Sequence, residues 1–228
     1  MILFSYPTLF GLADNNPYGL KIFAFLKLCG LPFEHRHILD ASSAPRAQLP
    51  YLTDNDQTIG DSDAIVAYVT KRYDVPLDGA LSPPQRDMGH LIGRMLDDLY
   101  WVMSYSRWKD QQFWPQFRDA MLQQHPELTA GALDSARDYN FKRYHYQGIG
   151  RYDAEAAYAR GIADLSALGN LLGDRSYLFG AAPGSVDAAI YGFIANIYHF
   201  DIDTPLKAYL RTRPNLVAHC AAMHALVT

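Results

Sequence analysis

Two asparagines stand directly before a proline where an apolar run with helical spacing begins, in the segment NNPYG at residues 15–19. Proline suits the first turn of a helix. The first backbone N–H groups of a helix have no partner within it, and the helix dipole places positive charge at the same end. We therefore expect a helix start at Asn16 and Pro17 that can hold an anion.

A second expected helix start combines acidic and hydroxyl side chains, in the segment GDSD at residues 60–63. One interpretation is an N-cap alone, with acids that complement the helix dipole. The other is that the Ser62 hydroxyl and the first N–H groups hold a carboxylate, while Asp61 or Asp63 attracts an ammonium group. In that case the segment would hold the charged end of an amino acid.

The segment Gln48-Leu49-Pro50 leads into an expected strand. Proline in a sheet is confined to the first residue of a strand or to an edge. A trans Leu49–Pro50 bond is the commoner form, and the pattern leaves a cis bond open as the alternative. A cis bond would turn the N–H and C=O groups of Leu49 outward, where they could pair with an extended peptide as an added strand does.

The N-terminal region must position these residues, and its pattern predicts a strand, a helix and a second strand. Residues 2–6 form a short apolar run, residues 17–29 carry apolar side chains at helical spacing, and residues 33–39 alternate. This order indicates a right-handed βαβ unit with a parallel strand pair. A hairpin with strands at residues 51–53 and 57–60 follows, and then a further helix.

A segment rich in proline, glycine and aspartate, residues 74–84, separates this region from a chain that is helical throughout. Helical spacing recurs over residues 158–172 and 187–200. An earlier apolar stripe consists of Leu91, Met95, Leu99 and Val102, widened by Ile92, Leu96 and Met103. We expect an α/β domain over residues 1–76 and a helical domain over residues 83–228.

Composition argues against several classes of function. The chain has 228 residues, of which 49% are hydrophobic, and a net charge of -4 without any basic block. Neither nucleic acid nor a membrane surface is therefore expected as a partner. The two cysteines form no C-x-x-C pair, the N-terminus lacks a signal-peptide pattern, and no run of about 18 apolar residues occurs. We expect a cytoplasmic protein.

Two residue pairs have spacings that suit metal ligands. They are His35 with His37, and Cys220 with His224. Two ligands do not make a zinc site, and no third ligand lies near either pair in the sequence, so no metal is expected. We interpret Cys29 as a packed apolar side chain.

Five segments of the chain resemble, in their order, a known family. They are LFGLADNNPYGLK, QLPYLTDNDQTIGDS, LYWVMSYSRW, YQGIGR and YLFGAAPGSVDA. Together they resemble the glutathione S-transferase superfamily over nearly the whole chain, most closely its metaxin-like and failed-axon-connections-like branch and the bacterial relatives of that branch. The resemblance implies a thioredoxin-like N-terminal domain, a cis bond before Pro50 and an all-helical C-terminal domain.

The resemblance also implies a site for glutathione as a co-substrate. Leu49 would meet the cysteinyl backbone of the tripeptide, and Asp61 and Ser62 would meet its γ-glutamyl end. Gln48, together with Arg46, would either meet the glycyl carboxylate or lie solvated at the surface. The three segments considered first would thus form one binding site.

The chain departs from the family pattern where the sulfur chemistry is expected. Asn16 falls where the family more usually has Ser or Cys, and Gly19 falls where many relatives keep a second Cys. Without these thiols no mixed disulfide can form there, so activation of a bound thiol remains. We expect Asn16 to donate to the thiolate, with Asn15, the Tyr6 hydroxyl or no activation as alternatives. Tyr18, in the same motif, is a candidate substrate contact.

One helical face carries three side chains that could wall a second pocket. Tyr100, Ser104 and Trp108 lie at i, i+4 and i+8, with Trp101 and Tyr105 beside them. Such a face is either core or, if this helix faces the N-terminal domain as in the family, the wall of an apolar co-substrate pocket. In the second case its hydroxyls could polarise an electrophile.

The segment PGSVDA resembles the capping box of the family, in which a hydroxyl residue lies three positions before the aspartate. Here Gly184 has that position and Asp187 is the aspartate, with Ser185 as a partial substitute for the missing hydroxyl. Glycine is tolerated at an N-cap at a cost of a few tenths of a kcal/mol. We interpret Asp187 as structural.

The sequence thus predicts a glutathione transferase-like homodimer that adds the thiolate of glutathione to a small apolar electrophile. Stabilisation of the thiolate and proximity would provide the catalysis. The alternative is a binding or adaptor module that keeps the fold without turnover, which the replacement of Ser or Cys by Asn16 favours somewhat.

Overall fold

The computed structural model describes all 228 residues, Met1–Thr228. The N-terminal part consists of β1(Ile2–Ser5), α1(Pro17–Leu28), β2(Glu34–His37), β3(Tyr51–Asp54), β4(Gln57–Gly60) and α2(Ser62–Arg72). The rest contains α3(Pro83–Trp108), α4(Trp114–Gln124), α5(Ala130–Gln147), α6(Ala154–Leu172), α7(Ser185–Tyr198), α8(Pro205–Arg211) and α9(Pro214–Val227). Short 3₁₀ turns occur at η1(Pro45–Ala47) and η2(Ile149–Arg151).

The four strands form one mixed sheet in the order β2-β1-β3-β4. β1 pairs with β2 in parallel, β1 with β3 antiparallel, and β3 with β4 antiparallel as a hairpin. Leu3 and Leu52, which lie opposite each other on β1 and β3, are fully buried. The expected βαβ unit and hairpin are confirmed, with strand bounds that differ from the predicted ones by at most two residues.

Helix α1 begins as the asparagine and proline pattern predicts. The Asn16 side-chain oxygen accepts a hydrogen bond from the Tyr18 N–H at 3.0 Å, and Pro17 occupies the first turn. The helix ends at Leu28, and Gly30 follows in a left-handed conformation with φ 64°. The Asn15 N–H donates to the Pro7 carbonyl at 3.1 Å, which holds the start of α1 close to the end of β1.

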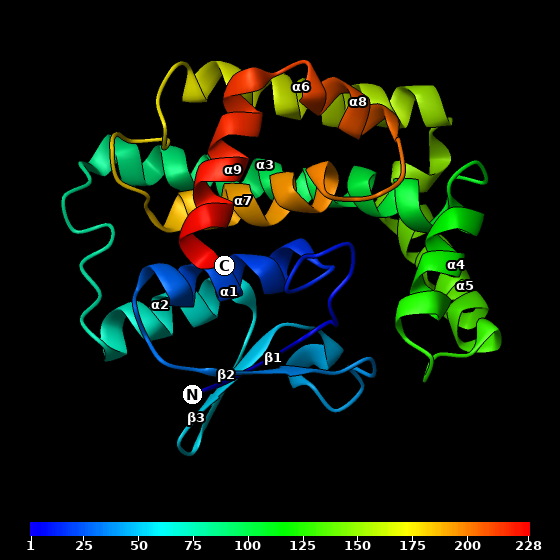
Figure 1. The fold of residues 1–228 in the computed structure, drawn as a ribbon, viewed down its shortest axis with the longest axis horizontal. Coiled ribbons are helices and arrows are strands. Elements are labelled where there is room, and N and C mark those ends of the chain that lie inside the picture. The colour runs from blue at the N-terminus through cyan, green and yellow to red at the C-terminus, as the bar shows by residue number, and fades with distance from the viewer.

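The sheet layer and the helical layer are joined mainly through α1 and α7, which lie against each other in Figure 1. Gly192 on α7 permits the close contact, because a Cβ at this position would lie 2.4 Å from the Pro17 carbonyl oxygen. Every residue of α7 from Val186 to Ile197 is buried. The buried helix therefore fixes where the start of α1 lies relative to the helical part of the chain.

The long helix α3 packs the predicted apolar stripe against the core except at Leu91. Leu91, assigned to the apolar stripe, is 63% exposed, so its predicted burial is wrong. The residues that pack inward are Ile92, Leu96, Leu99, Val102 and Met103. Leu91 lies about 20° around the helix from the buried Val102, so its exposure reflects how much of the length of α3 is covered and not which face it lies on.

Asp187 stabilises the start of α7, as the capping interpretation predicts. One carboxylate oxygen accepts the Gly184 N–H at 2.8 Å, and the other accepts the Leu178 N–H at 2.8 Å and lies 3.0 Å from His219 Nε2. Asp187 and His219 are both almost completely buried. The aspartate is therefore a structural residue remote from the sheet edge.

The hydroxyl residue missing at Gly184 is replaced by Asp78, from the segment between α2 and α3. Asp78 accepts hydrogen bonds from the N–H of Ser185, at 2.9 Å, and from the Ser185 hydroxyl. A Cβ at Gly184 would lie 2.8 Å from the same Asp78 oxygen that accepts the N–H. A distant carboxylate thus occupies the place of the usual side chain at the N-cap, which is why glycine fits there.

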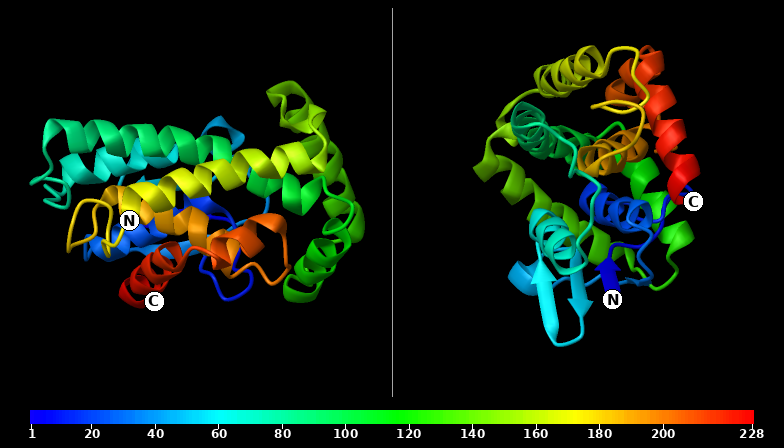
Figure 2. Two further views of the ribbon diagram at one scale, coloured as in Figure 1. Left: turned by 90° about the horizontal axis from the view of Figure 1, so that it is seen from above. Right: turned by 90° about the vertical axis from the view of Figure 1, so that its left-hand side faces the viewer.

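Helices α4 and α5 lie at one end of the molecule, beyond the packed helices α3, α6 and α7 (Figures 1 and 2). The ribbon views show them beside the end of α3 and on the same side as the start of α1. None of the helices is long and apolar enough to cross a bilayer. Tyr139 and Arg143 of α5 line one cavity together with Leu49 and Pro50, which precede β3.

Candidate functional site

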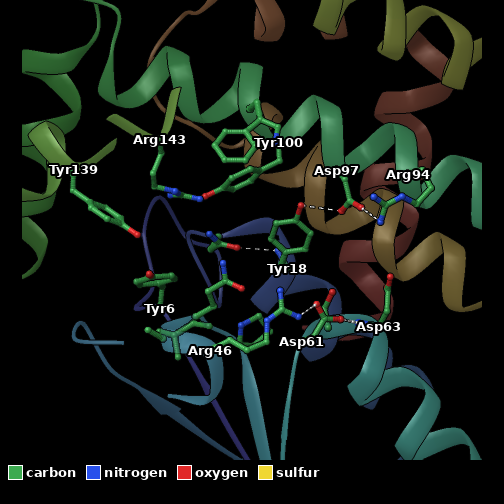
Figure 3. A pocket seen from close by; sticks show the side chains of 17 residues that line it. Tyr6, Tyr18, Arg46, Asp61, Asp63, Arg94, Asp97, Tyr100, Tyr139 and Arg143 are labelled. Atoms are coloured by element: carbon green, nitrogen blue, oxygen red, sulfur yellow. Dashed lines mark hydrogen bonds and ion pairs between the residues drawn. The ribbon is translucent and has the colours of Figure 1, made fainter. Parts of the chain in front are cut away.

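Two adjoining cavities lie between the sheet part and the helices α3 and α5, and Figure 3 shows the side chains that line the first. The first measures about 370 Å³ and is lined mostly by polar and charged residues. The second measures about 450 Å³, and 12 of its 20 lining residues are hydrophobic. Both lie within the roughly 300–1,000 Å³ typical of small-molecule sites. The residues that border both cavities are Tyr6, Asn16, Tyr100, Tyr139 and Arg143.

Asn16 lines both cavities. Its side-chain oxygen is fixed by the Tyr18 N–H, so the carboxamide has a defined orientation. The nitrogen, which carries two N–H donors, makes no hydrogen bond within the chain. The side chain that caps α1 is therefore also a free donor towards the cavities.

The backbone at the start of α1 is less open than the sequence suggests. The Asn16 N–H donates to an Asp14 carboxylate oxygen at 2.6 Å, the Tyr18 N–H donates to the Asn16 side chain, and Pro17 has no N–H. The prediction of free backbone N–H groups is thus wrong for Asn16 and Tyr18. The local cap and the aspartate satisfy these donors first, which leaves the Asn16 carboxamide as the main donor.

Asp14 holds the loop before α1 in place through its buried carboxyl group. It is completely buried, burial raises its pKa well above the usual value, and one carboxylate oxygen has no hydrogen-bond partner. A Cβ at Gly19 would lie 1.6 Å from that oxygen, so the carboxyl group fills the space that a side chain at Gly19 would need. The sequence pattern contained no signal for this pairing of Asp14 and Gly19.

Two buried residues of the helical part hold the same loop. Arg107 on α3 donates to the Asn15 carbonyl at 2.6 Å, and Asn196 on α7 donates to the Asp14 carbonyl at 3.3 Å. Arg107 also donates to the Asn196 carbonyl at 2.7 Å, and burial lowers its pKa to about 10. The loop before α1 therefore depends on both parts of the chain.

The two alternative sulfur donors differ in position. Tyr6 borders both cavities, and burial raises the pKa of its hydroxyl to about 12, so it stays protonated and can donate. Asn15 lines only the apolar cavity, and its side-chain nitrogen donates to the Pro7 carbonyl at 2.9 Å. Tyr6 is thus better placed than Asn15 to share a ligand with Asn16.

The start of α2 lines the polar cavity with Asp61, Ser62 and Asp63. Asp61 caps the helix by accepting the N–H groups of Asp63 and Ala64, and it does so with a strained φ of 81°. The Ser62 hydroxyl accepts a hydrogen bond from Lys21 at 3.0 Å. Its own proton remains available to a ligand.

The acids of the α2 start are already paired, which the sequence did not indicate. Lys21, on the buried face of α1, forms an ion pair with Asp63, and Arg46 lies 3.2 Å from Asp61. Both side chains of the second pair are largely exposed, so that pair is weak and can exchange partners with a ligand. Lys21 was missed because a lysine within an apolar helical run has no distinctive spacing.

The Leu49–Pro50 peptide bond is cis, and the amide of Leu49 donates to no carbonyl of the chain. Leu49 and Pro50 are buried, whereas Gln48 and Arg46 are exposed, and all four line the polar cavity. The cis bond that the resemblance implies is confirmed. The edge is thus unoccupied by the protein itself and faces the cavity.

The predicted aromatic face of α3 borders the apolar cavity, with Tyr100, Ser104 and Trp108 among its lining residues. The Ser104 hydroxyl lies 2.7 Å from the buried Tyr144 hydroxyl, so it is already satisfied in the core. The Trp108 ring stacks on Trp114 at 5.5 Å. Of this face, Tyr100 therefore retains a hydroxyl directed at the cavities (Figure 3).

Four charged or aromatic residues that line the polar cavity were not predicted: Arg94, Asp97, Tyr139 and Arg143. Asp97 accepts the Tyr18 hydroxyl at 2.9 Å and lies 2.8 Å from Arg94, so it links α3 to α1. Asp97 lies at i−3 from Tyr100, and Tyr139 and Arg143 lie at i and i+4 on α5. These spacings are a usable signal only once one knows which face of each helix meets the sheet part.

Family models for this chain match both parts. The "Glutathione S-transferase N-terminal domain" matches residues 17–113, and the "Glutathione S-transferase, C-terminal domain" matches residues 161–223. The isoprene-epoxide–glutathione S-transferase of Rhodococcus sp. (strain AD45) is 30% identical over 225 residues, with 94% of both chains covered. The chain belongs to the glutathione S-transferase family.

Other relatives of this glutathione S-transferase chain are more distant. Failed axon connections of Drosophila melanogaster is 28% identical, and the match covers 93% of this chain and 54% of that protein. Metaxin-1 of Bos taurus is 24% identical, and the match covers 99% of this chain and 74% of that protein. Among solved structures, a glutathione transferase family member from Pseudomonas fluorescens with two glutathione bound has a TM-score of 0.61 at 17% identity, covering 99% and 91% of the chains. The fold, a thioredoxin-like domain plus a helical domain, is thus the fold of the family, as predicted.

Proposed function

We propose that this protein binds glutathione in the polar cavity and adds its thiolate to a small apolar electrophile held in the adjoining cavity. The observation that carries the proposal is the Asn16 carboxamide, whose oxygen is fixed by the helix start and whose nitrogen is free at the boundary of both cavities. A sulfur bound beside this nitrogen would face the electrophile directly.

The charges of the polar cavity complement a zwitterionic tripeptide. In the proposed complex the free edge of Leu49 pairs with the cysteinyl backbone, and Ser62 donates to the γ-glutamyl carboxylate, while Asp61 attracts the ammonium group. Arg46 and Gln48 lie exposed beside this edge and are available to the glycyl carboxylate. The tripeptide would then run from α2 to the start of α1.

The available donors are strong enough to activate the thiol. A fall of two units from a thiol pKa of about 8.5 requires about 2.7 kcal/mol of preference for the thiolate. A hydrogen bond from Asn16 to a charged sulfur contributes about 1.5–3 kcal/mol. The N-terminus of α1 adds about 0.3–1 kcal/mol. The hydroxyl of Tyr6 is a further donor at the same boundary.

The second substrate would lie in the apolar cavity against Tyr100 and Trp108. Proximity to the thiolate then supplies much of the rate acceleration, because two reactants are held in contact. The relative from Rhodococcus supports turnover, since its name describes transfer of glutathione to an epoxide. A division into domains at residues 1–76 and 83–228, a cytoplasmic location and a homodimer stay predictions from the sequence.

A non-catalytic binding or adaptor module is the second candidate. It is favoured by Asn16, which replaces the hydroxyl or thiol usual in the family, and by the similarity to Failed axon connections and metaxin-1. Such a protein would keep the tripeptide site without lowering the pKa of the bound thiol.

Calorimetric titration with glutathione, followed by a conjugation assay on a generic aryl halide, separates the two candidates. Binding with turnover above the uncatalysed rate supports the transferase. Binding without turnover supports the module. Absence of binding contradicts both, and glutathione disulfide serves as the ligand control because it lacks the thiol.

A further inference from the structure

Three aspartates of the chain are buried, and Asp14 differs from the other two in how its carboxyl oxygens are bonded. One oxygen of Asp54 accepts the hydroxyls of Tyr68, at 3.0 Å, and Tyr73, at 2.7 Å. Its other oxygen accepts a side-chain N–H of Asn55 at 3.3 Å. Asp54 is thus surrounded by the donors that an ionised carboxylate needs.

Asp187 likewise has a donor at each oxygen, the backbone N–H groups of Leu178 and Gly184. Asp14 has a donor at one oxygen only, the Asn16 N–H at 2.6 Å. Its second oxygen has no hydrogen-bond partner, although the residue has no exposed surface. A buried carboxylate that lacks donors is costly, and such a group takes up a proton instead.

No basic side chain bonds to Asp14. Arg107, the buried cation that holds the same loop, donates to the Asn15 carbonyl and to Asn196. Burial is the largest effect on the pKa of Asp14 and raises it, whereas the Arg107 charge lowers it by less. The other titratable group that faces Asp14 is the Tyr6 hydroxyl, which is uncharged because burial raises its pKa to about 12.

We propose that Asp14 is a neutral carboxylic acid, which positions Asn16 without placing a negative charge beside the bound sulfur. This role rests on the proposed binding of glutathione. The carbonyl oxygen of the acid accepts the Asn16 N–H, and the oxygen without a partner carries the proton. A Cβ at Gly19 would lie 1.6 Å from that second oxygen and 3.0 Å from the Ser5 Cβ, so the space around it is closed to water.

The charge state matters because Asp14 lies at the start of α1. An ionised acid at a helix start offsets the positive end of the helix dipole. A negative charge there would also oppose the thiolate, because a like charge disfavours ionisation of a neighbouring group. A neutral acid keeps the hydrogen bond to the Asn16 N–H and avoids both effects. Asp14 acts through Asn16 and is therefore a positioning residue.

Infrared difference spectroscopy of the full-length protein and its Asp14→Asn variant at about pH 7 tests the charge state directly. We expect the C=O band of a protonated carboxyl group in the unaltered protein and its loss in the variant. Loss of carboxylate bands in its place would contradict the neutral acid. The matched control is Asp54→Asn, a buried aspartate that lines neither cavity. It should lose carboxylate bands and keep the protonated band.

The pKa of the bound thiol, read from its thiolate absorbance, is the second readout. Asp14→Asn keeps an acceptor for the Asn16 N–H and is neutral at every pH. If Asp14 is itself neutral, the exchange removes no charge, so the pKa of the bound thiol should change by less than about 0.3 units. A larger fall would show that the variant has lost a negative charge, and would contradict the proposal.

Asp14→Leu has a similar volume but no acceptor, and it tests the positioning of Asn16. We expect kcat/KM to fall by about 10-fold and the pKa of the bound thiol to rise, because the Asn16 N–H loses its partner. The Kd for glutathione should change by less than about threefold. Asp14→Ala takes the place of the leucine variant if that variant does not fold. Values equal to those of the unaltered protein would overturn the positioning role.

The infrared readout needs neither glutathione nor turnover, which separates this inference from the proposed function. A protein that shows the protonated band and binds glutathione without turnover would support the neutral Asp14 and contradict the transferase alone. A protein that binds no glutathione would contradict the proposed function, and the positioning role of Asp14 with it.

Discussion

The two cavities differ in how their charged groups are satisfied. Around the polar cavity Asp61, Asp63 and Asp97 each pair with a basic side chain of the chain itself. At the boundary with the apolar cavity, Asn16 keeps a free amide nitrogen and Arg143 has no carboxylate. The first region has the character of a preformed binding site, in which a ligand exchanges with existing pairs. The second has the character of a reaction site, because its unpaired donors can stabilise negative charge that develops on a reacting group.

The largest expected effect is at Asn16, where the two regions meet. Asn16→Asp keeps a side chain that caps α1 but replaces the N–H donors with a negative charge. We expect kcat/KM for any electrophile to fall by about 100-fold, or about 2.7 kcal/mol, because the thiolate loses its donor and meets a like charge. Steady-state kinetics measures this loss.

The matched control is Asn16→Ser, since serine also caps a helix and supplies a hydroxyl donor. It is expected to retain most of the activity, and melting temperatures near that of the unaltered protein would show that α1 is intact in both variants. Equal rates for Asn16→Asp and the unaltered protein would remove Asn16 from the mechanism.

The second effect is at Ser62, inside the polar cavity. Ser62→Ala removes the hydroxyl that we assign to the γ-glutamyl carboxylate, so the Kd for glutathione should rise by about 10-fold or more. The kcat at saturating glutathione should change by less than about twofold, because the loss concerns binding and not the transition state. Calorimetry and kinetics measure the two quantities separately.

Ser43→Ala, an exposed serine that lines neither cavity, is the control for Ser62 and should leave both quantities unchanged. If Ser62→Ala lowered kcat and left the Kd for glutathione unaltered, Ser62 would act in the reaction, and the assignment of the polar cavity to binding alone would be wrong.

A smaller effect is expected at Tyr6. Tyr6→Phe removes a neutral donor and should lower kcat/KM by about two- to tenfold. Burial raises the pKa of this hydroxyl to about 12, so it is protonated and donating at every lower pH. Because loss of this donor raises the pKa of the bound thiol, the ratio of the unaltered to the variant rate should be largest at about pH 6 and should fall as the pH rises past that pKa. A ratio that rises with pH would indicate that Tyr6 acts as a base.

The smallest effect on activity is expected at Gly184, which borders neither cavity. Serine is ordinarily the better N-cap, but here a Cβ would lie 2.8 Å from the Asp78 oxygen and displace the carboxylate that caps α7. Gly184→Ser should lower the free energy of unfolding by about 1 kcal/mol, the usual value of a lost cap, and leave both rates and glutathione affinity unchanged.

Denaturant unfolding measures this change. In an Asp78→Ala background no carboxylate occupies the space beside Gly184. Gly184→Ser should then leave the free energy of unfolding unchanged or raise it. A gain in stability from Gly184→Ser in the unaltered protein would contradict the account of Asp78 as the cap.

Several helices and strands and part of the site could be predicted from the sequence, because they depend on interactions between neighbouring residues. The start of α1 at Pro17, the hairpin of β3 and β4, and the cap at Asp61 depend on residues within a few positions of each other. The cis bond before Pro50 came only with the family resemblance, because the dipeptide itself favours the trans form.

The pairings within the site could not be predicted, because they join distant segments. Lys21 meets Asp63 only when α1 packs beside α2, and Arg143 reaches Tyr100 only when α5 docks at the end of α3. The exposure of Leu91 likewise depends on which part of the length of α3 its neighbours cover. Helical spacing shows which residues share a face, but not what that face meets.

The most direct test of the central claim is a pH titration of the thiolate absorbance of glutathione in complex with the protein. We expect the bound thiol to titrate with a pKa about two units below the free value of about 8.5, and we expect Asn16→Asp to reverse most of this shift. A bound thiol whose pKa equals that of free glutathione would contradict it.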